Sequence, residues 1–212
     1  MSQTAFVRMP TAKRQALVFA AAEEFASHPF EQASLNRIIA SCRMSKSSFY
    51  HVIESKESLL TLVVDRLRSD AALDWAPPSP ADFTSDFWAT AAHVFDDALR
   101  VWPHSRALEL LWRIVHANRD DPAVSSLGTS FEAWVASTLQ VGRDAGAIDS
   151  ACPIELQCLA VATLLTAFDE WALRQTDDAL RQTDDKDRPR GGGDLESAAA
   201  QQFRLLRRLL EA

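Results

Sequence analysis

The sequence of 212 residues predicts an all-α protein, because apolar residues recur at helical spacing in most of its segments. In the first of these segments, Leu17, Ala21 and Phe25 stand four residues apart and share one helix face. Prolines separate the segments, and the strongest break lies at residues 76–80, where three prolines exclude a helix interior. We therefore expect a small N-terminal three-helix domain followed by a larger helical domain.

The small domain contains two short predicted helices joined by a turn. Residues 35–42 carry an apolar stripe after a serine N-cap, Ser34, and residues 46–53 carry another after Ser45. Two short helices joined by about three residues describe a helix-turn-helix, whose second helix enters the DNA major groove. The other faces of the second helix carry hydrogen-bonding groups and no carboxylate: Lys46, Ser47, Ser48, Tyr50 and His51.

A dense set of residues within 13–62 follows a known pattern. The matching residues are Ala21, Phe25, Phe30, Ser34, Ile38, Ser45-Lys46, Phe49-Tyr50-His51, Ser55-Lys56-Glu57 and Leu59-Leu60. In these residues the chain resembles the DNA-binding domain of the TetR/AcrR family of bacterial transcription regulators. The remainder resembles the family in being helical and of suitable length.

The resemblance implies a DNA-binding regulator that acts as a homodimer on a palindromic operator, most often as a repressor that a small molecule releases. Lys56 would serve as the counter-charge to a phosphate at the start of the following helix. The residues expected to contact DNA are Ser34, Arg43, Ser45, Lys46, Ser47, Ser48, Tyr50, His51 and Lys56.

Arg43 stands in the turn where the family usually has glycine. That turn tends to need a positive φ, which costs a residue with a Cβ on the order of 1 kcal/mol. We therefore expect backbone strain or a slightly different turn at Arg43, together with an additional cation near the DNA.

The net charge of −7 is divided unevenly along the chain. Residues 1–60 carry seven Lys/Arg and five Asp/Glu, whereas residues 61–212 carry 15 and 24. The basic part coincides with the predicted helix-turn-helix, and the acidic remainder would discourage indiscriminate binding to nucleic acid.

Several classes of protein are disfavoured. The odd number and wide spacing of the cysteines argue against a disulfide framework or a zinc site, and no other cofactor is expected. The sequence contains no glycine-rich phosphate loop, no nucleophile motif and no paired histidines, so an enzyme is not expected. The longest apolar run, residues 158–168, is too short to span a membrane, and no signal-peptide pattern opens the chain, so we expect a cytoplasmic protein. A helical adaptor that binds only proteins would not need the basic N-terminal third.

We divide the chain into a DNA-binding domain (1–56), a connecting helix (57–75) and a helical domain for effector binding and dimerisation (76–212). A flexible loop is expected at 176–195. The heptad ALRQTDD occurs twice in tandem over residues 172–185, and we interpret it as a duplication that lengthens a solvated loop or helix end.

The predicted helix at 154–171 differs from the others, because residues 158–168 include no charged side chain. A helix that is apolar all round is buried all round, so a second copy of the chain could cover the side that its own core leaves open. The last predicted helix, 196–210, has an apolar face bordered by arginines. The family dimerises through these two helices, and we expect the same here.

All six tryptophans lie outside the predicted DNA-binding domain. Such aromatics usually form core, but the resemblance implies an effector pocket in this part of the chain. An aromatic-rich pocket would suit a small, largely apolar or aromatic ligand. The alternative is a packed core in a regulator that binds DNA constitutively. The residues expected to line the pocket are Phe87, Phe95, Trp102, Trp112, Trp134 and Phe168.

Overall fold

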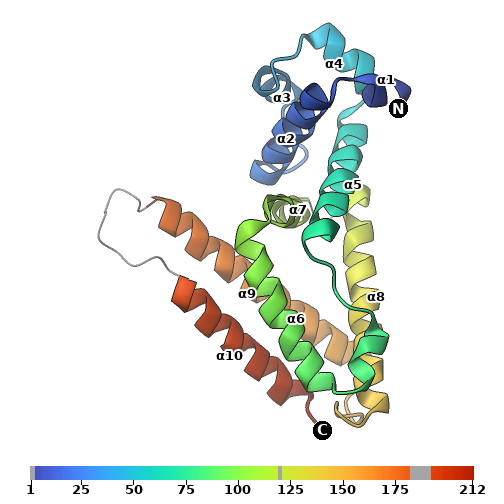
Figure 1. Ribbon diagram of the computed structural model, residues 1–212, viewed down its shortest axis with the longest axis vertical. Helices are drawn as coiled ribbons and strands as arrows, with labels where there is room; N and C mark the ends of the chain where they lie inside the picture. The colour runs from blue at the N-terminus through green and yellow to red at the C-terminus, as the bar shows by residue number, and fades with distance from the viewer. Residues whose placement is uncertain (1–2, 119–120, 182–191) are drawn as a thin grey trace. The chain divides into compact units, whose positions relative to one another are not determined.

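The computed structural model describes residues 3–118, 121–181 and 192–212, and it confirms the all-α class (Figure 1). These residues form α-helices and short 3₁₀ helices, labelled η. Their bounds are α1 (Gln3–Arg8), α2 (Thr11–Ser27), α3 (Leu35–Ser41), α4 (Lys46–Val52), α5 (Lys56–Asp74), η1 (Pro80–Thr84), α6 (Phe87–Val101), η2 (Trp102–His104), α7 (Arg106–Ala117), α8 (Pro122–Asp144), α9 (Ile154–Arg181) and α10 (Gly192–Leu210).

The chain folds into two compact units that interleave in sequence. The N-terminal unit comprises residues 1–76 and 101–129, and the C-terminal unit comprises residues 77–100 and 130–212. The first boundary lies between Ala76 and Pro77, in the proline-rich stretch. Residues 101–129, including α7, belong to the same unit as α2 and α5.

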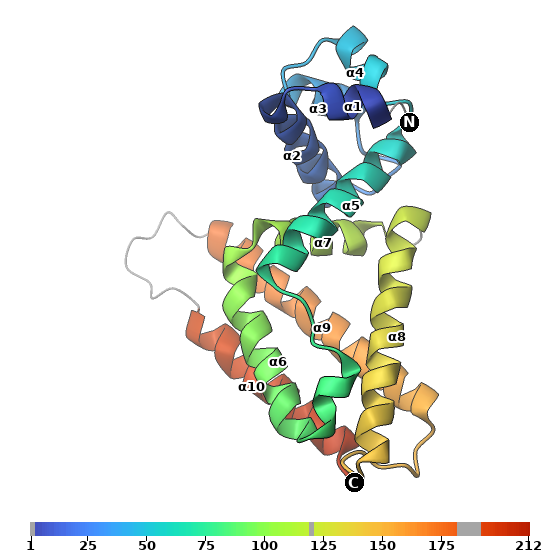
Figure 2. The same cartoon turned by 45° about the vertical axis from the view of Figure 1, so that its right-hand side comes forward.

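The N-terminal unit has one continuous apolar core. Leu17 and Phe25 of α2, Phe49 of α4 and Leu60 of α5 are fully buried in it. Ile114 of α7 joins the same core, because α7 packs against both α2 and α5 (Figure 2). The helix-turn-helix thus rests on a base formed by helices from both segments of the unit.

Serine N-caps begin α3 and α4 where the sequence predicts them, and a third serine begins α5. The hydroxyl oxygens of Ser34, Ser45 and Ser55 each accept a hydrogen bond from the backbone N–H three residues further on. Such caps satisfy N–H groups that have no partner within the helix, so they fix where α3, α4 and α5 start.

The C-terminal unit is built around α6, α8, α9 and α10, and α9 and α10 lie side by side (Figure 1). Its core contains Phe83, Phe87, Leu139, Ile148 and Leu206. Helix α9 continues to Arg181 and α10 begins at Gly192, so the central part of the loop expected at 176–195 lies outside the described residues.

Candidate nucleic-acid interface

The two short helices α3 and α4 are joined by a turn at residues 42–45, as the sequence predicts. One side of the pair is buried against the rest of the unit, with α3 contacting α2 and α4 contacting α1. The buried residues on that side are Ile38, Ile39, Phe49, Val52 and Ile53. Because this side is fixed by packing, the opposite side of α4 is held toward solvent.

The solvent side of α4 carries Lys46, Ser47, Tyr50 and His51, all exposed. The Tyr50 side chain is 55% exposed, and its ring meets the buried Phe49 ring edge-on at 5.3 Å between centroids. This contact orients the ring, while the residue as a whole stays largely exposed. An exposed helix with a cation, hydroxyls and an imidazole offers the groups that hydrogen-bond to phosphates and base edges.

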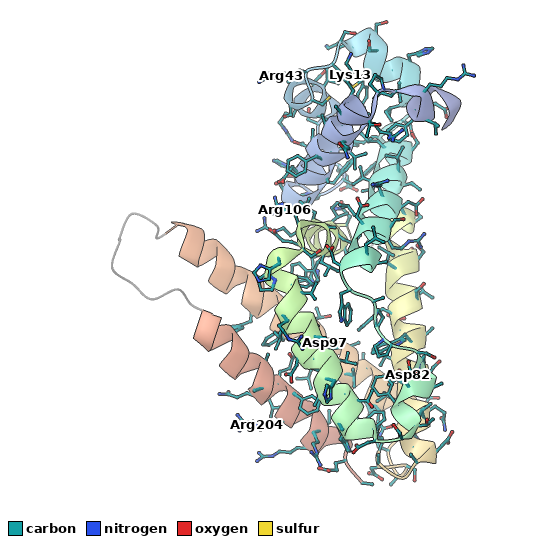
Figure 3. All side chains as sticks on the ribbon, in the orientation of Figure 1. Lys13, Arg43, Asp82, Asp97, Arg106 and Arg204 are labelled. Carbon is teal, nitrogen blue, oxygen red and sulfur yellow. The ribbon has the colours of Figure 1, made fainter. Side chains whose placement is uncertain are left out.

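Arg43 has the positive φ that the sequence predicts, 53°, and no other non-glycine residue among those described shares this conformation. The Met44 N–H donates to the Ile39 carbonyl and the Arg43 N–H donates to the Ala40 carbonyl, both at 3.2 Å. This pair of bonds is the Schellman motif, in which glycine is favoured at the position that Arg43 occupies. The side chain of Arg43 is exposed at the turn between α3 and α4 (Figure 3).

Lys56 occupies a different position from the one expected of a counter-charge to a phosphate. Its Nζ donates to the carbonyl oxygens of Phe30 (2.5 Å), Ala33 (3.2 Å) and Glu31 (3.4 Å), and it lies 4.5 Å from the centroid of the Phe30 ring. The ammonium therefore ties the loop between α2 and α3 to the start of α5. In the free protein its donors are directed at the backbone of its own domain.

The serines in the predicted contact set also have internal roles. Besides capping α4, the Ser45 hydroxyl donates to the Ser48 Oγ at 2.8 Å. The Ser34 Oγ caps α3, and the Ser34 N–H donates to the Glu24 carboxylate at 2.7 Å. Ser45 and Ser48 nevertheless remain exposed, as do Arg43, Lys46, Ser47, Tyr50 and His51, whereas Ser34 and Lys56 are half-buried and shape the motif.

Glu24 is a positioning residue that the sequence analysis missed. Its carboxylate is 9% exposed and accepts hydrogen bonds from the Arg37 Nε and Nη2 as well as from the Ser34 N–H. Burial raises the pKa of Glu24, but the bonds from Arg37 and Ser34 and the nearby Arg37 and His28 charges outweigh it, so the pKa is lowered overall. A signal was present: Glu24 stands seven residues after Leu17, on the apolar face of the predicted helix.

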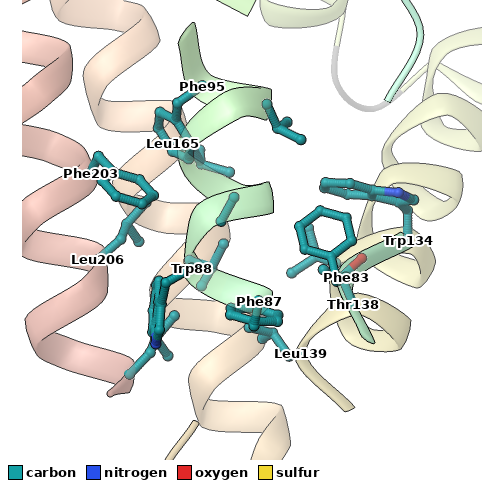
Figure 4. Close-up of a pocket in the computed structure, with 15 residues that line it drawn as sticks. Phe83, Phe87, Trp88, Phe95, Trp134, Thr138, Leu139, Leu165, Phe203 and Leu206 are labelled. Carbon is teal, nitrogen blue, oxygen red and sulfur yellow. The ribbon is translucent and has the colours of Figure 1, made fainter. Parts of the chain in front are cut away.

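A cavity of about 90 Å³ lies in the C-terminal unit (Figure 4). Three residues of the predicted pocket, Phe87, Phe95 and Trp134, line it. The other three do not. Trp102 and Trp112 belong to the N-terminal unit, where their rings meet edge-on, and Phe168 packs against Trp171. The lining residues that the sequence analysis missed include Phe83, Trp88 and Phe203.

The geometry of the N-terminal unit is that of a helix-turn-helix DNA-binding protein. Residues 17–63 match the family described as bacterial regulatory proteins, tetR family, and these residues span α2 to α5. The match identifies a tetR-family DNA-binding domain in this part of the chain. Members of this family are DNA-binding transcriptional repressors that often respond to ligands.

Solved structures share the fold along almost the whole chain. A TetR family transcriptional regulator from Chloroflexus aurantiacus superposes with a TM-score of 0.70 at 17% identity, over 99% of this chain and 98% of that one. A putative transcriptional regulator from Streptomyces coelicolor superposes with a TM-score of 0.59 at 22% identity, over 93% of this chain and 98% of that one. NalD, the secondary repressor of the MexAB-OprM multidrug efflux pump in Pseudomonas aeruginosa, superposes with a TM-score of 0.56 at 13% identity, over 100% of this chain and 98% of that one.

These identities are low, so the likeness establishes the fold and not the operator or the effector. No curated protein sequence matches the chain. Within the described residues, no helix combines the length and the apolar composition that crossing a membrane requires.

Proposed function

We propose that this protein represses transcription by binding a palindromic operator through α4, and that a small, largely apolar or aromatic effector releases it. The observation that carries the proposal is the exposed, carboxylate-free face of α4 on a packed helical base. Arg43 and Lys46 add positive charge beside that face. Operator binding would take place in the cytoplasm, where bacterial DNA lies.

Exposed leucines on α9 and α10 support a homodimer formed by these helices. Leu156 and Leu159 of α9 are 55% and 63% exposed, and Leu205 and Leu209 of α10 are 55% and 53% exposed. They stand three or four residues apart, so each pair forms a stripe along one helix face. Two copies of this helix pair would bury all four leucines in a four-helix bundle. A two-fold pair of α4 helices would then read half-sites about 34–36 Å apart.

The aromatic cavity supports an effector that is apolar or aromatic. Its wall is linked by a short stretch of chain to the DNA-binding unit, because α5 ends at Asp74 and Phe83 of the cavity follows nine residues later. Within this stretch, the Pro78 carbonyl accepts a hydrogen bond from the Trp134 Nε1–H, and Trp134 also lines the cavity. A ligand that displaces Trp134 would therefore act on the segment that leaves α5. We propose that α5, which begins shortly after α4, transmits this displacement to the DNA-binding helix.

The proposal is tested by measuring the affinity of the purified protein for duplex DNA from upstream of its own gene, by fluorescence anisotropy at several salt concentrations. We expect binding that is tighter than to a scrambled duplex and that weakens steeply as salt is raised. Tyr50→Phe should weaken it by removing one hydroxyl while preserving the ring. Failure to bind either duplex, even at low salt, would favour the adaptor alternative. Specific binding that no ligand relieves would favour a constitutive regulator.

A further inference from the structure

The cavity in the C-terminal unit is lined almost entirely by carbon. Of its 15 lining residues, 14 are aliphatic or aromatic, and none carries a charge. Two of them are tryptophans, but their N–H groups are already used. The Trp88 Nε1–H donates to the Ala147 carbonyl at 3.2 Å, and the Trp134 Nε1–H donates to the Pro78 carbonyl at 2.8 Å. Both indoles therefore present only ring carbons to a ligand.

Thr138 supplies the one polar side chain in this lining. The residue is 6% exposed, and its Oγ1 is buried without a hydrogen-bond partner. It lies on α8 beside Phe83 and Trp134 (Figure 4). A buried hydroxyl in an apolar wall is unfavourable unless something pairs with it, and a hydroxyl can either donate or accept.

We infer that the cavity binds a small uncharged molecule, with an apolar ring or short chain and a single hydrogen-bonding group that pairs with the Thr138 hydroxyl. This inference deepens the proposed effector response and rests on it. Carboxylates and ammonium groups are excluded as the buried part of the ligand, because no lining side chain could neutralise their charge. A cavity of about 90 Å³ limits the buried part to roughly the size of one small ring.

The test uses three probes of similar size: phenol, toluene and benzoate. Phenol and toluene differ only in a hydroxyl in place of a methyl group, so their affinity ratio isolates the hydrogen bond. Binding is measured on the full-length protein by titration calorimetry and by intrinsic tryptophan fluorescence, to which Trp88 and Trp134 of the cavity contribute. We expect millimolar or tighter binding of phenol and toluene, and at least tenfold weaker binding of benzoate.

Two matched substitutions then locate the bond. Thr138→Val keeps the shape and removes the hydroxyl, and it should lower the phenol-to-toluene affinity ratio about tenfold, or about 1.4 kcal/mol. Thr138→Ser keeps the hydroxyl and should keep the ratio within about threefold of the wild-type value. An unchanged ratio in Thr138→Val, benzoate binding as tight as that of phenol, or failure of both neutral probes to bind would overturn the inference.

A second measurement needs no ligand. If the hydroxyl is unpaired in the free protein, Thr138→Val should raise the melting temperature, by about 2–4 °C for a chain of this size. A lower melting temperature would show that the hydroxyl is bonded within the protein and would contradict the assignment.

Operator release, measured in parallel by anisotropy, separates this inference from the proposed function. Phenol binding that depends on Thr138 but leaves the operator bound would uphold the site and refute the effector response. Release of the operator by a charged compound, equally in wild type and Thr138→Val, would uphold the response and refute this site.

Discussion

Arg43 occupies a turn position whose backbone conformation is unfavourable for a residue with a Cβ. Its φ of 53° closes the Schellman motif after α3, a conformation that glycine adopts without steric cost. Arg43→Gly should therefore be more stable than Arg43→Ala by about 1 kcal/mol, because alanine keeps the Cβ that causes the strain.

Urea denaturation of both variants measures this difference, and both lack the cation, so charge is held constant in the comparison. Operator affinity should fall in both to a similar extent. An alanine variant as stable as the glycine variant would mean that the turn relaxes and stores no strain.

Lys46 and Lys56 offer a matched pair of lysines with opposite expected roles. Lys46 is exposed on α4, whereas the Lys56 ammonium donates to three backbone carbonyls. Lys56→Met keeps the apolar stem and leaves those carbonyls without their donor, so it should lower the free energy of unfolding by about 1–3 kcal/mol. Lys46→Met should leave stability within about 0.5 kcal/mol and weaken DNA binding at all sequences.

Thermal melts and anisotropy on the two variants distinguish these roles. If Lys56→Met instead keeps the wild-type stability and lowers the operator affinity, the result would support the phosphate contact that the sequence alone predicts for Lys56.

Glu24 gives the stability of the motif a defined pH dependence. Its pKa is lowered in the folded state from an ordinary value of 4.5, so the unfolded chain binds more protons near that pH. The stabilisation by the Glu24 carboxylate is therefore complete above about pH 4.5 and is lost as the pH falls through the folded pKa. Glu24→Gln should lower the melting temperature at pH 7 and flatten its decline between pH 5 and 3. A parallel decline in wild type and variant would contradict this role.

At the scale of elements, the sequence predicts helices well and their partners poorly. Apolar spacing and serine caps place the bounds of α3 and α4 within one residue, because both signals are local. Periodicity shows only that a helix face is buried and not what covers it. That is why Trp102 and Trp112 were assigned to a pocket in which neither takes part.

Contacts between residues distant in sequence decide where α7 packs. Near its start, Ser105 donates to the Asp74 carboxylate at 2.5 Å and Arg106 pairs with Glu23 of α2. Just after its end, the Asn118 Nδ2 donates to the Phe25 carbonyl at 3.3 Å. These contacts join residues that are 31 to 93 positions apart in the sequence, so no local sequence pattern predicts them. The exposed residues of α4, which we propose contact DNA, in contrast follow from the period of that helix alone.

At the scale of the whole molecule, the exposed leucines of α9 and α10 predict a dimer that charge should break. Leu159→Glu combined with Leu205→Glu would place carboxylates in the proposed interface and should shift the protein to monomers at micromolar concentration in sedimentation velocity. Leu206 is unsuitable for this test, because it is 5% exposed and belongs to the core of its own unit.

Leu73→Glu is the matched control. Leu73 is 85% exposed on α5, so the same change from leucine to glutamate is made there outside the proposed interface. It should leave the sedimentation coefficient unchanged. A folded double variant that remains dimeric would place the interface on another surface.

The outward position of Tyr50 on α4 gives the protein a built-in spectroscopic label. The chain contains a single tyrosine, whose ring meets the Phe49 ring and which is largely exposed on the proposed DNA-binding helix. Biosynthetic incorporation of 3-fluorotyrosine would therefore place one fluorine nucleus per chain at this position, and a two-fold symmetric dimer would give one ¹⁹F resonance. The six tryptophans all lie after residue 74, so their emission reports on other parts of the molecule. The ¹⁹F NMR signal would thus report DNA binding, and the tryptophan fluorescence would report ligand binding in the cavity, in the same labelled protein.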